Sequence, residues 1–195
     1  MTHSALGTAR RADARHNVAR ILRAAVTCLG RDPAASMNDI AREAGVGRVT
    51  VYAHYPSREA LVEAAMVHVL AEGDEVLATV DLTGDPRDGL RALIEAGWML
   101  LAQSTSVLEA ALAALPPGRV QDLHAGPEQR IHDLVRRGQA LGVFRTDLPA
   151  RWLASVLHHL LHGAVADVAA ARLDPADAPR YLSAVTLAAY GATGA

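Results

Sequence analysis

Residues 36–61, SMNDIAREAGVGRVTVYAHYPSREAL, decide the fold of this chain. Ser36 is a good N-cap, and Asp39 stands three residues on, where a capping box places its acid. Gly45 supplies the left-handed residue that ends a helix, and a second helix begins near Gly47. The pattern therefore predicts two short helices joined by a tight turn.

The second of these helices is predicted to have an outward face without an acidic side chain. Val51 and Tyr55 lie four residues apart, which puts them on one side of a helix, where we expect them to be buried. The side chains left to face outward are Arg48, Thr50, Tyr52, Ala53 and His54. A tight turn followed by an acid-free helix is typical of a helix-turn-helix that reads DNA.

These residues resemble the N-terminal DNA-binding domain of the TetR family of bacterial transcription regulators. The matching positions run without a gap and are Asp39-Ile40-Ala41, Ala44-Gly45-Val46, Thr50-Val51-Tyr52, His54-Tyr55 and Ser57-Arg58-Glu59-Ala60-Leu61. The resemblance implies an all-α fold of about nine helices. It also implies a helix-turn-helix DNA-binding domain at residues 1–60 and a ligand-binding and dimerisation domain at 61–195.

The resemblance further implies which side chains face DNA. Arg48 is expected to contact a base, a guanine, and Thr50 a thymine methyl group or a phosphate. Phosphates would be held by Tyr52, His54 and Arg58. The remaining members of the predicted DNA-binding set are Ser36, Asn38, Gly47 and Val49. Gly47 departs from the family pattern, which more often has Ser or Thr there, so the recognition helix lacks the usual side-chain cap.

Charge is distributed unevenly along the chain, although the net charge is only −2. Residues 1–60 hold nine Arg against five acids, a balance of +4, whereas residues 61–195 hold ten Arg against sixteen acids, a balance of −6. A basic N-terminal part suits binding to phosphates. Before the first helix, expected at about 13–29, Arg10, Arg11 and Arg15 lie in an arm that either follows the DNA or is solvated.

Composition favours helices, since half of the 195 residues are apolar and only 4% are aromatic. No apolar run is long enough for a membrane span, and the N-terminus does not read as a secretory signal. Cys28 is the only cysteine, which excludes a disulfide framework and indicates a cytoplasmic protein. We expect Cys28 to be a buried packing residue.

Beyond the helix-turn-helix, periodicity and turn signals predict a series of helices. Pro56 and Ser57 precede a long helix that runs to about residue 80, and 81–89 reads as a linker. Further helices are expected at about 88–103, 107–115, 127–141, 150–173 and 179–191.

The helix at 150–173 is apolar on more than one face, which indicates that it is central or lies in an interface. The helix at 179–191 has a small apolar surface of its own. In the resembled family two such helices from each subunit form a four-helix dimer interface. A homodimer is therefore expected, with its two helix-turn-helix units on a palindromic double-stranded operator.

The resemblance also implies a cavity for a small, hydrophobic effector. Trp98, Met99, His158 and His162 are the candidate lining residues. The alternative is that Trp98, Trp152 and Phe144 are ordinary core residues. His158 and His162 have a spacing that can bind metal, but no third ligand accompanies them, so neither a metal nor another cofactor is expected.

The sequence thus predicts a homodimeric, ligand-responsive transcription regulator, a repressor, and not an enzyme. Gly45-Val46-Gly47 is not a dinucleotide-binding loop, because no strand precedes it. The alternative is an all-helical interaction protein with a degenerate helix-turn-helix.

Overall fold

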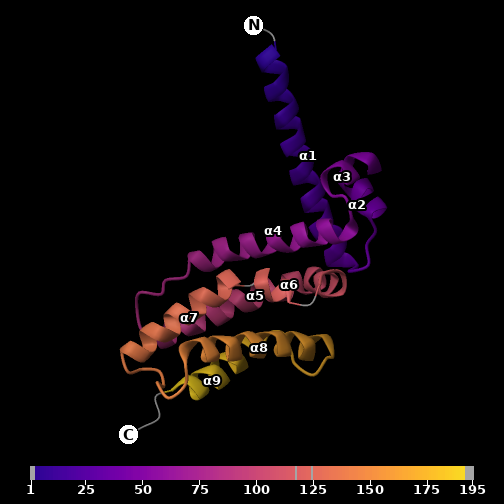
Figure 1. The fold of residues 1–195 in the computed structure, drawn as a ribbon. Helices are drawn as coiled ribbons and strands as arrows, with labels where there is room; N and C mark the ends of the chain where they lie inside the picture. Colours follow the sequence, from indigo (N-terminus) through magenta and orange to yellow (C-terminus); the bar gives the residue numbers. More distant parts are fainter. Residues whose placement is uncertain (1–2, 117, 124, 192–195) are drawn as a thin grey trace. The chain divides into compact units, whose positions relative to one another are not determined.

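The computed structural model describes residues 3–116, 118–123 and 125–191, and this part of the chain forms nine helices (Figure 1). They are α1 (His3–Arg31), α2 (Met37–Ala44), α3 (Arg48–His54), α4 (Arg58–Ala78), α5 (Pro86–Ala114), α6 (Arg119–Leu123), α7 (Ala125–Ala140), α8 (Ala150–Ala169) and α9 (Ala178–Tyr190). Within the described ranges the only β-type pairing is an isolated bridge between Phe144 and Gly191. The predicted all-α fold is confirmed.

The chain folds into two compact units. Unit 1 comprises Met1–Leu70 and Ser104–Val120, and unit 2 comprises Ala71–Gln103 and Gln121–Ala195. The division between them therefore falls inside α4, inside α5 and inside the short α6. The expected division at residue 60 separates DNA binding from ligand binding and dimerisation, and it stays a prediction.

Unit 1 is built on α1, against which α2 packs. Ile21, Ala25 and Leu29 repeat at helical spacing on α1 and are completely buried. Ile40 of α2 and Val51 of α3 are also completely buried, so each of the two short helices contributes a side chain to the core. Helices this short are not stable alone, and tertiary packing is what holds them.

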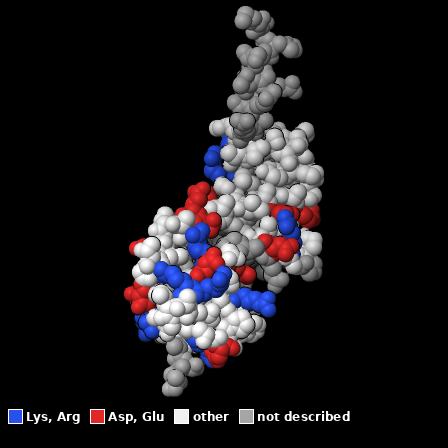
Figure 2. All heavy atoms as spheres, turned by 60° about the vertical axis from the view of Figure 1, so that its left-hand side comes forward, with Lys and Arg blue, Asp and Glu red and all other residues white. Residues whose placement is uncertain are grey.

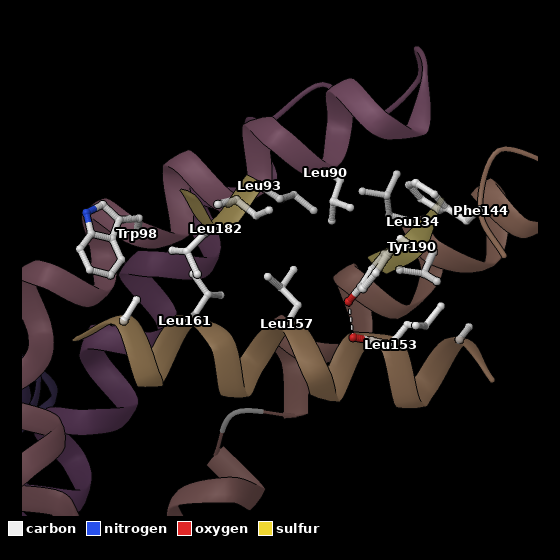
Figure 3. Packing of buried hydrophobic residues seen from close by; sticks show 14 of the residues in the cluster. Leu90, Leu93, Trp98, Leu134, Phe144, Leu153, Leu157, Leu161, Leu182 and Tyr190 are labelled. Carbon is white, nitrogen blue, oxygen red and sulfur yellow. Dashed lines mark hydrogen bonds between the residues drawn. The ribbon is translucent and has the colours of Figure 1, made fainter. Parts of the chain in front are cut away.

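Unit 2 is a helical bundle around one hydrophobic cluster (Figure 3). Figure 3 shows side chains of α5, α7 and α9 gathered against Leu153, Leu157 and Leu161 of α8. The Tyr190 hydroxyl at the end of α9 donates a hydrogen bond to the Leu153 carbonyl. Burial raises the pKa of Tyr190 far above its ordinary value, so this donor stays protonated.

Phe144, in the turn after α7, is almost fully buried and makes an edge-to-face contact with Tyr190, with ring centroids 5.9 Å apart. Gly138 of α7 makes room for this ring, because a Cβ at that position would overlap Phe144. The expectation that Phe144 is a core residue is confirmed.

Two helices, α1 and α5, are much longer than the sequence predicts. Helix α1 begins at His3, not near residue 13, so the expected arm is helical. The side chains of Arg10, Arg11 and Arg15 lie outside the described part. The helices expected at 88–103 and 107–115 are one continuous helix, α5. Residues 104–106 are helical and continue α5 into Val107 and Leu108, which are buried.

Other differences are smaller. The short helix α6 follows the Pro-Pro-Gly stretch and was not predicted, and α8 ends at Ala169, not at Leu173. Trp152 was considered as a core residue, but it is 57% exposed on α8. Cys28 is only half-buried, and partial burial raises the pKa of its thiol.

Candidate DNA-binding face

Local structure sets both ends of α2. The Asp39 backbone N–H donates to the Ser36 hydroxyl at 3.3 Å, and the Asp39 carboxylate accepts from the Ser36 N–H at 3.1 Å, which completes the predicted capping box. The Ser36 hydroxyl also donates to the Asp39 carboxylate at 2.6 Å, and this bond, followed by the one from the Ser36 N–H, lowers the pKa of Asp39. At the other end of α2, Gly45 has φ 61°, the left-handed conformation that the sequence predicted.

The turn continues into α3 at Gly47, which is the N-cap and makes no side-chain capping bond. This confirms the inference that the recognition helix lacks a side-chain cap. Its first backbone N–H groups therefore have no partner from the cap side chain. Backbone donors at a helix N-terminus are suited to a phosphate.

The outer face of α3 presents a cation and apolar groups. Arg48 is exposed, and its Cζ atom lies 5.2 Å from the centre of the Tyr52 ring. This cation–π contact between residues four apart orders the guanidinium along the helix. Val49 is 84% exposed, which is unusual for a branched apolar side chain. Thr50 and His54 are half-buried at the sides of this face.

The other predicted DNA-binding residues lie at helix starts. Ser36 and Asn38 are exposed where α2 begins. Arg58 is the first residue of α4, and its guanidinium is turned back into unit 1, where Nε donates to the Ala35 carbonyl at 3.1 Å and Nη2 to the Pro33 carbonyl at 2.5 Å. These bonds use two of the five N–H donors of Arg58, and a phosphate contact by this residue stays a prediction.

Sequence reasoning missed Arg20 of α1. Its Nη2 donates to the Ala44 carbonyl at 2.6 Å and to the Gly45 carbonyl at 3.2 Å. No local pattern announces this contact, since the partners are 24 and 25 residues away in sequence.

Part of the positive charge of the N-terminal region is matched within unit 1. Arg31 pairs with Glu43 at 3.6 Å, and Arg42 pairs with Asp39 at 3.3 Å. Both pairs are exposed, so they contribute little to stability. In the view of Figure 2, acidic and basic side chains likewise lie next to one another. Arg48, by contrast, faces outward over Tyr52 from a helix that carries no acid.

The four residues predicted for an effector site lie in different environments of unit 2. Trp98 is buried in the cluster of Figure 3, and its indole N–H donates to the Pro175 carbonyl at 3.1 Å. Met99 is 62% exposed. His158 and His162 lie side by side on α8, with ring centroids 4.3 Å apart, and the His158 Nδ1 is 3.8 Å from a Glu128 carboxylate oxygen. Their part in an effector site stays a prediction.

A separate groove of about 470 Å³ lies on unit 2. Its basic side chains already bind the unit's own acceptors: Arg130 pairs with Asp74 at 2.7 Å, and Arg137 donates to the Thr83 and Gly84 carbonyls at 2.9 Å each. The groove is lined by Asp74, Leu82, Gln129, Arg130, Asp133, Leu134 and Arg137, a set that includes none of the four predicted effector residues.

The described ranges contain neither a metal-binding cluster nor a membrane-spanning helix. No group of three or more His, Cys, Asp or Glu residues there is arranged to hold a metal ion. No helix among the same residues is both long and apolar enough to cross a bilayer.

The N-terminal part of this chain is similar to known bacterial regulatory proteins. The model of the tetR family of bacterial regulatory proteins matches residues 21–65, which contain the whole α2–turn–α3 segment. Over these residues the chain is similar to the TetR family. Among its relatives is the HTH-type transcriptional repressor LfrR of Mycolicibacterium smegmatis, which is 41% identical over 76 residues. That match spans 38% of this chain and 40% of the length of LfrR.

Solved structures of the TetR family have the same fold over nearly the whole chain. A TetR-family transcriptional regulator from Agrobacterium tumefaciens is 23% identical with a TM-score of 0.71, and the match covers 91% of this chain and 99% of that one. The structure of LfrR in complex with proflavine is 23% identical with a TM-score of 0.68, over 90% and 96% of the two chains. The TetR regulator SCO0520 from Streptomyces coelicolor is 27% identical with a TM-score of 0.59, over 88% and 97%. At the identities of the first two, the similarity establishes the fold alone.

Proposed function

We propose that this protein is a ligand-responsive transcription regulator, a repressor that binds a palindromic operator as a homodimer. The observation that carries the proposal is the acid-free outer face of α3, held by a capped α2 and a left-handed turn. The repressor LfrR is a relative by sequence, which supports the sign of regulation. The protein acts on DNA in the cytoplasm and carries out no chemical reaction.

Base readout is assigned to the exposed start of α3. Arg48 has the donors for bidentate contact to the O6 and N7 atoms of guanine, and Val49 offers an apolar surface to a thymine methyl group. Thr50, Tyr52 and His54 would fix the helix on the phosphates, together with Ser36, Asn38 and the backbone of Gly47.

Dimerisation is assigned to α8 and α9, which pack against each other in unit 2. Their inner faces fill the core, yet both helices also leave large apolar side chains exposed: Trp152 on α8, and Tyr181 and Val185 on α9. Small residues lie between them on the outer faces, including Gly163, Ala166, Ala184 and Ala188. A surface with aromatic anchors and small residues is suited to close helix packing with a second copy.

The effector is assigned to unit 2 and is proposed to be a small, hydrophobic molecule. LfrR was solved with proflavine, so proflavine is a reasonable first probe. Helix α4 begins in unit 1 and ends in unit 2, which makes it the candidate element for coupling effector binding to DNA binding. An effector changes operator affinity only if it binds the two states of the protein with different affinities.

Selection from random duplex DNA at near-physiological salt tests the proposal. We expect enrichment of a palindrome with two half-sites. Binding that is salt-sensitive but blind to sequence would contradict it and favour the alternative, an interaction protein with a degenerate helix-turn-helix. Titration of proflavine, followed by tryptophan fluorescence and by release of the selected operator, then tests the effector assignment.

A further inference from the structure

Helix α2 is held at its C-terminal end by an arginine of α1, and the loop that precedes it is held by an arginine of α4. Its last carbonyl groups have no partner within the helix and form the negative end of the helix dipole. The Gly45 and Val46 N–H groups satisfy the Arg42 and Ala41 carbonyls at 3.1 and 3.0 Å. The Ala44 and Gly45 carbonyls are taken by Arg20 of α1, at 2.6 and 3.2 Å.

The other end is held through the loop that leads into Ser36. Asp32 shapes this loop, since its carboxylate accepts the Ala34 N–H at 2.9 Å and its carbonyl accepts the Ala35 N–H at 3.0 Å. Arg58 of α4 then donates to the Pro33 and Ala35 carbonyls from two nitrogens of one guanidinium, a fork that binds two acceptors at once. The loop is thereby fixed to α4 immediately before the capping box.

Because α2 and α3 are joined by a three-residue turn, the placement of α2 decides the direction in which α3 points. We propose that Arg20 and Arg58 are positioning residues for DNA recognition: each holds one end of α2, and together they present α3 in a single orientation. The inference rests on the proposed DNA-binding function. Both arginines bind backbone carbonyls of the protein. They would therefore strengthen operator binding without contacting a DNA phosphate.

A phosphate contact and a positioning contact predict different results. Loss of one phosphate contact weakens binding to all sequences alike and lowers the salt dependence of log K by about 0.9. Loss of a positioning contact weakens operator binding more than nonspecific binding and leaves the salt dependence unchanged. Lysine keeps the charge of Arg58 but cannot reproduce a planar fork on two carbonyls, so it rescues only the phosphate role.

The test uses the full chain with Arg20→Met, Arg58→Met and Arg58→Lys. Arg23→Met is the matched control, because Arg23 is an exposed residue of α1 and its loss changes the charge by the same amount. Binding to the selected operator and to scrambled duplex is measured over a series of salt concentrations, at a temperature where circular dichroism shows full helix content. Backbone hydrogen exchange of α2 and α3 is measured on the same proteins without DNA. Arg20→Lys is added to the set, so that if a methionine variant does not fold, the lysine variant at that position carries the comparison.

We expect Arg20→Met and Arg58→Met to reduce the ratio of operator to scrambled-duplex affinity at least tenfold relative to Arg23→Met, with an unchanged salt slope. Arg58→Lys should resemble Arg58→Met, and α2 and α3 should exchange at least tenfold faster than in the control. Equal specificity ratios, or a reduced salt slope that lysine restores, would overturn the inference. If the wild-type chain selects no operator, the proposed function is contradicted, whatever the role of the two arginines. If α2 and α3 exchange as slowly in the Arg20 and Arg58 variants as in Arg23→Met, the positioning role is overturned, whatever the chain binds.

Discussion

Arg48 is the residue to which we assign base readout. Its guanidinium lies over Tyr52 at the exposed start of α3, so the side chain is partly ordered before DNA arrives. Ordering of this kind reduces the entropy lost on binding. Arg20 and Arg58 carry the same charge and lie in the same unit, yet their donors are directed to backbone carbonyls. We therefore assign Arg48 to DNA contact, and Arg20 and Arg58 to holding the protein backbone.

Replacing Arg48 with Ala should relax sequence preference at one base position, with a loss of about 1–3 kcal/mol for the operator that carries the preferred base. The reason is that a bidentate contact to guanine is lost while the phosphate contacts remain. Repeating the selection with the variant measures this. A uniform loss of affinity across all sequences would instead identify Arg48 as a phosphate contact.

Replacing Gly45 with Ala should destabilise unit 1 by about 1–2 kcal/mol, because a residue with a Cβ is strained at positive φ. A Cβ here would also lie 2.8 Å from the Arg20 Nη2, so the arginine would have to move. Urea unfolding measures the loss. Gly30→Ala is the matched control: nothing lies within 4 Å of its Cβ position, and in a helix alanine is preferred to glycine. Equal effects at the two positions would contradict this account of Gly45.

Among the elements, α2 shows how local chemistry sets both ends of a helix. The capping box begins it, and the left-handed glycine ends it, within eight helical residues. Helix α5 shows the opposite case, since its continuity through Ser104 and Thr105 depends on burial of the residues that follow. Helices with strong local signals at their ends can be read from sequence, whereas helices continued by packing cannot.

Replacing Ser36 with Ala should destabilise the α2 region by about 1 kcal/mol at neutral pH, because α2 loses its N-cap. The effect should depend on pH. Hydrogen bonds from Ser36 lower the pKa of Asp39, so this contribution to stability is present above the ordinary aspartate pKa of about 3.9 and is lost as pH falls through the lowered value. The difference between wild type and variant should therefore narrow in acid.

Urea unfolding of the two proteins at a series of pH values from 7 downward measures this narrowing. Asp39→Asn serves as the control, because it removes the titrating carboxyl and should abolish the pH dependence of the Ser36→Ala effect. A difference that stays constant, or grows, in acid would show that the bonds between Ser36 and Asp39 do not contribute as proposed.

The proposed dimer would allow the protein to bind a palindrome, because it presents two helix-turn-helix units to the DNA. A single α3 contacts few base pairs, and two copies related by a twofold axis double the contacts and fix the spacing of the half-sites. The outer faces of α8 and α9 expose large apolar side chains to water, and burying them against a second copy would be favourable.

Replacing Val185 with Asp should weaken self-association at least tenfold, because Val185 is 54% exposed on α9 and a buried, unpaired carboxylate is costly in an interface. Sedimentation velocity over a dilution series measures this. Leu141→Asp, at a site 63% exposed outside α8 and α9, is the matched control and should leave the dimer intact. A dimer that tolerates Val185→Asp as well as it tolerates Leu141→Asp would move the interface elsewhere.

Residue types and their spacing were enough to predict the all-α fold, the helix-turn-helix and the local structure at Ser36, Asp39 and Gly45. These features depend on hydrogen bonds between residues one to five positions apart, and such bonds follow from residue type and spacing. The tertiary structure alone decided that Trp152 is exposed, that α5 is one helix, and that Arg20 and Arg58 reach carbonyls 23 to 25 residues away. Those outcomes depend on which helix faces pack together, and the spacing of side chains along the chain does not encode that directly.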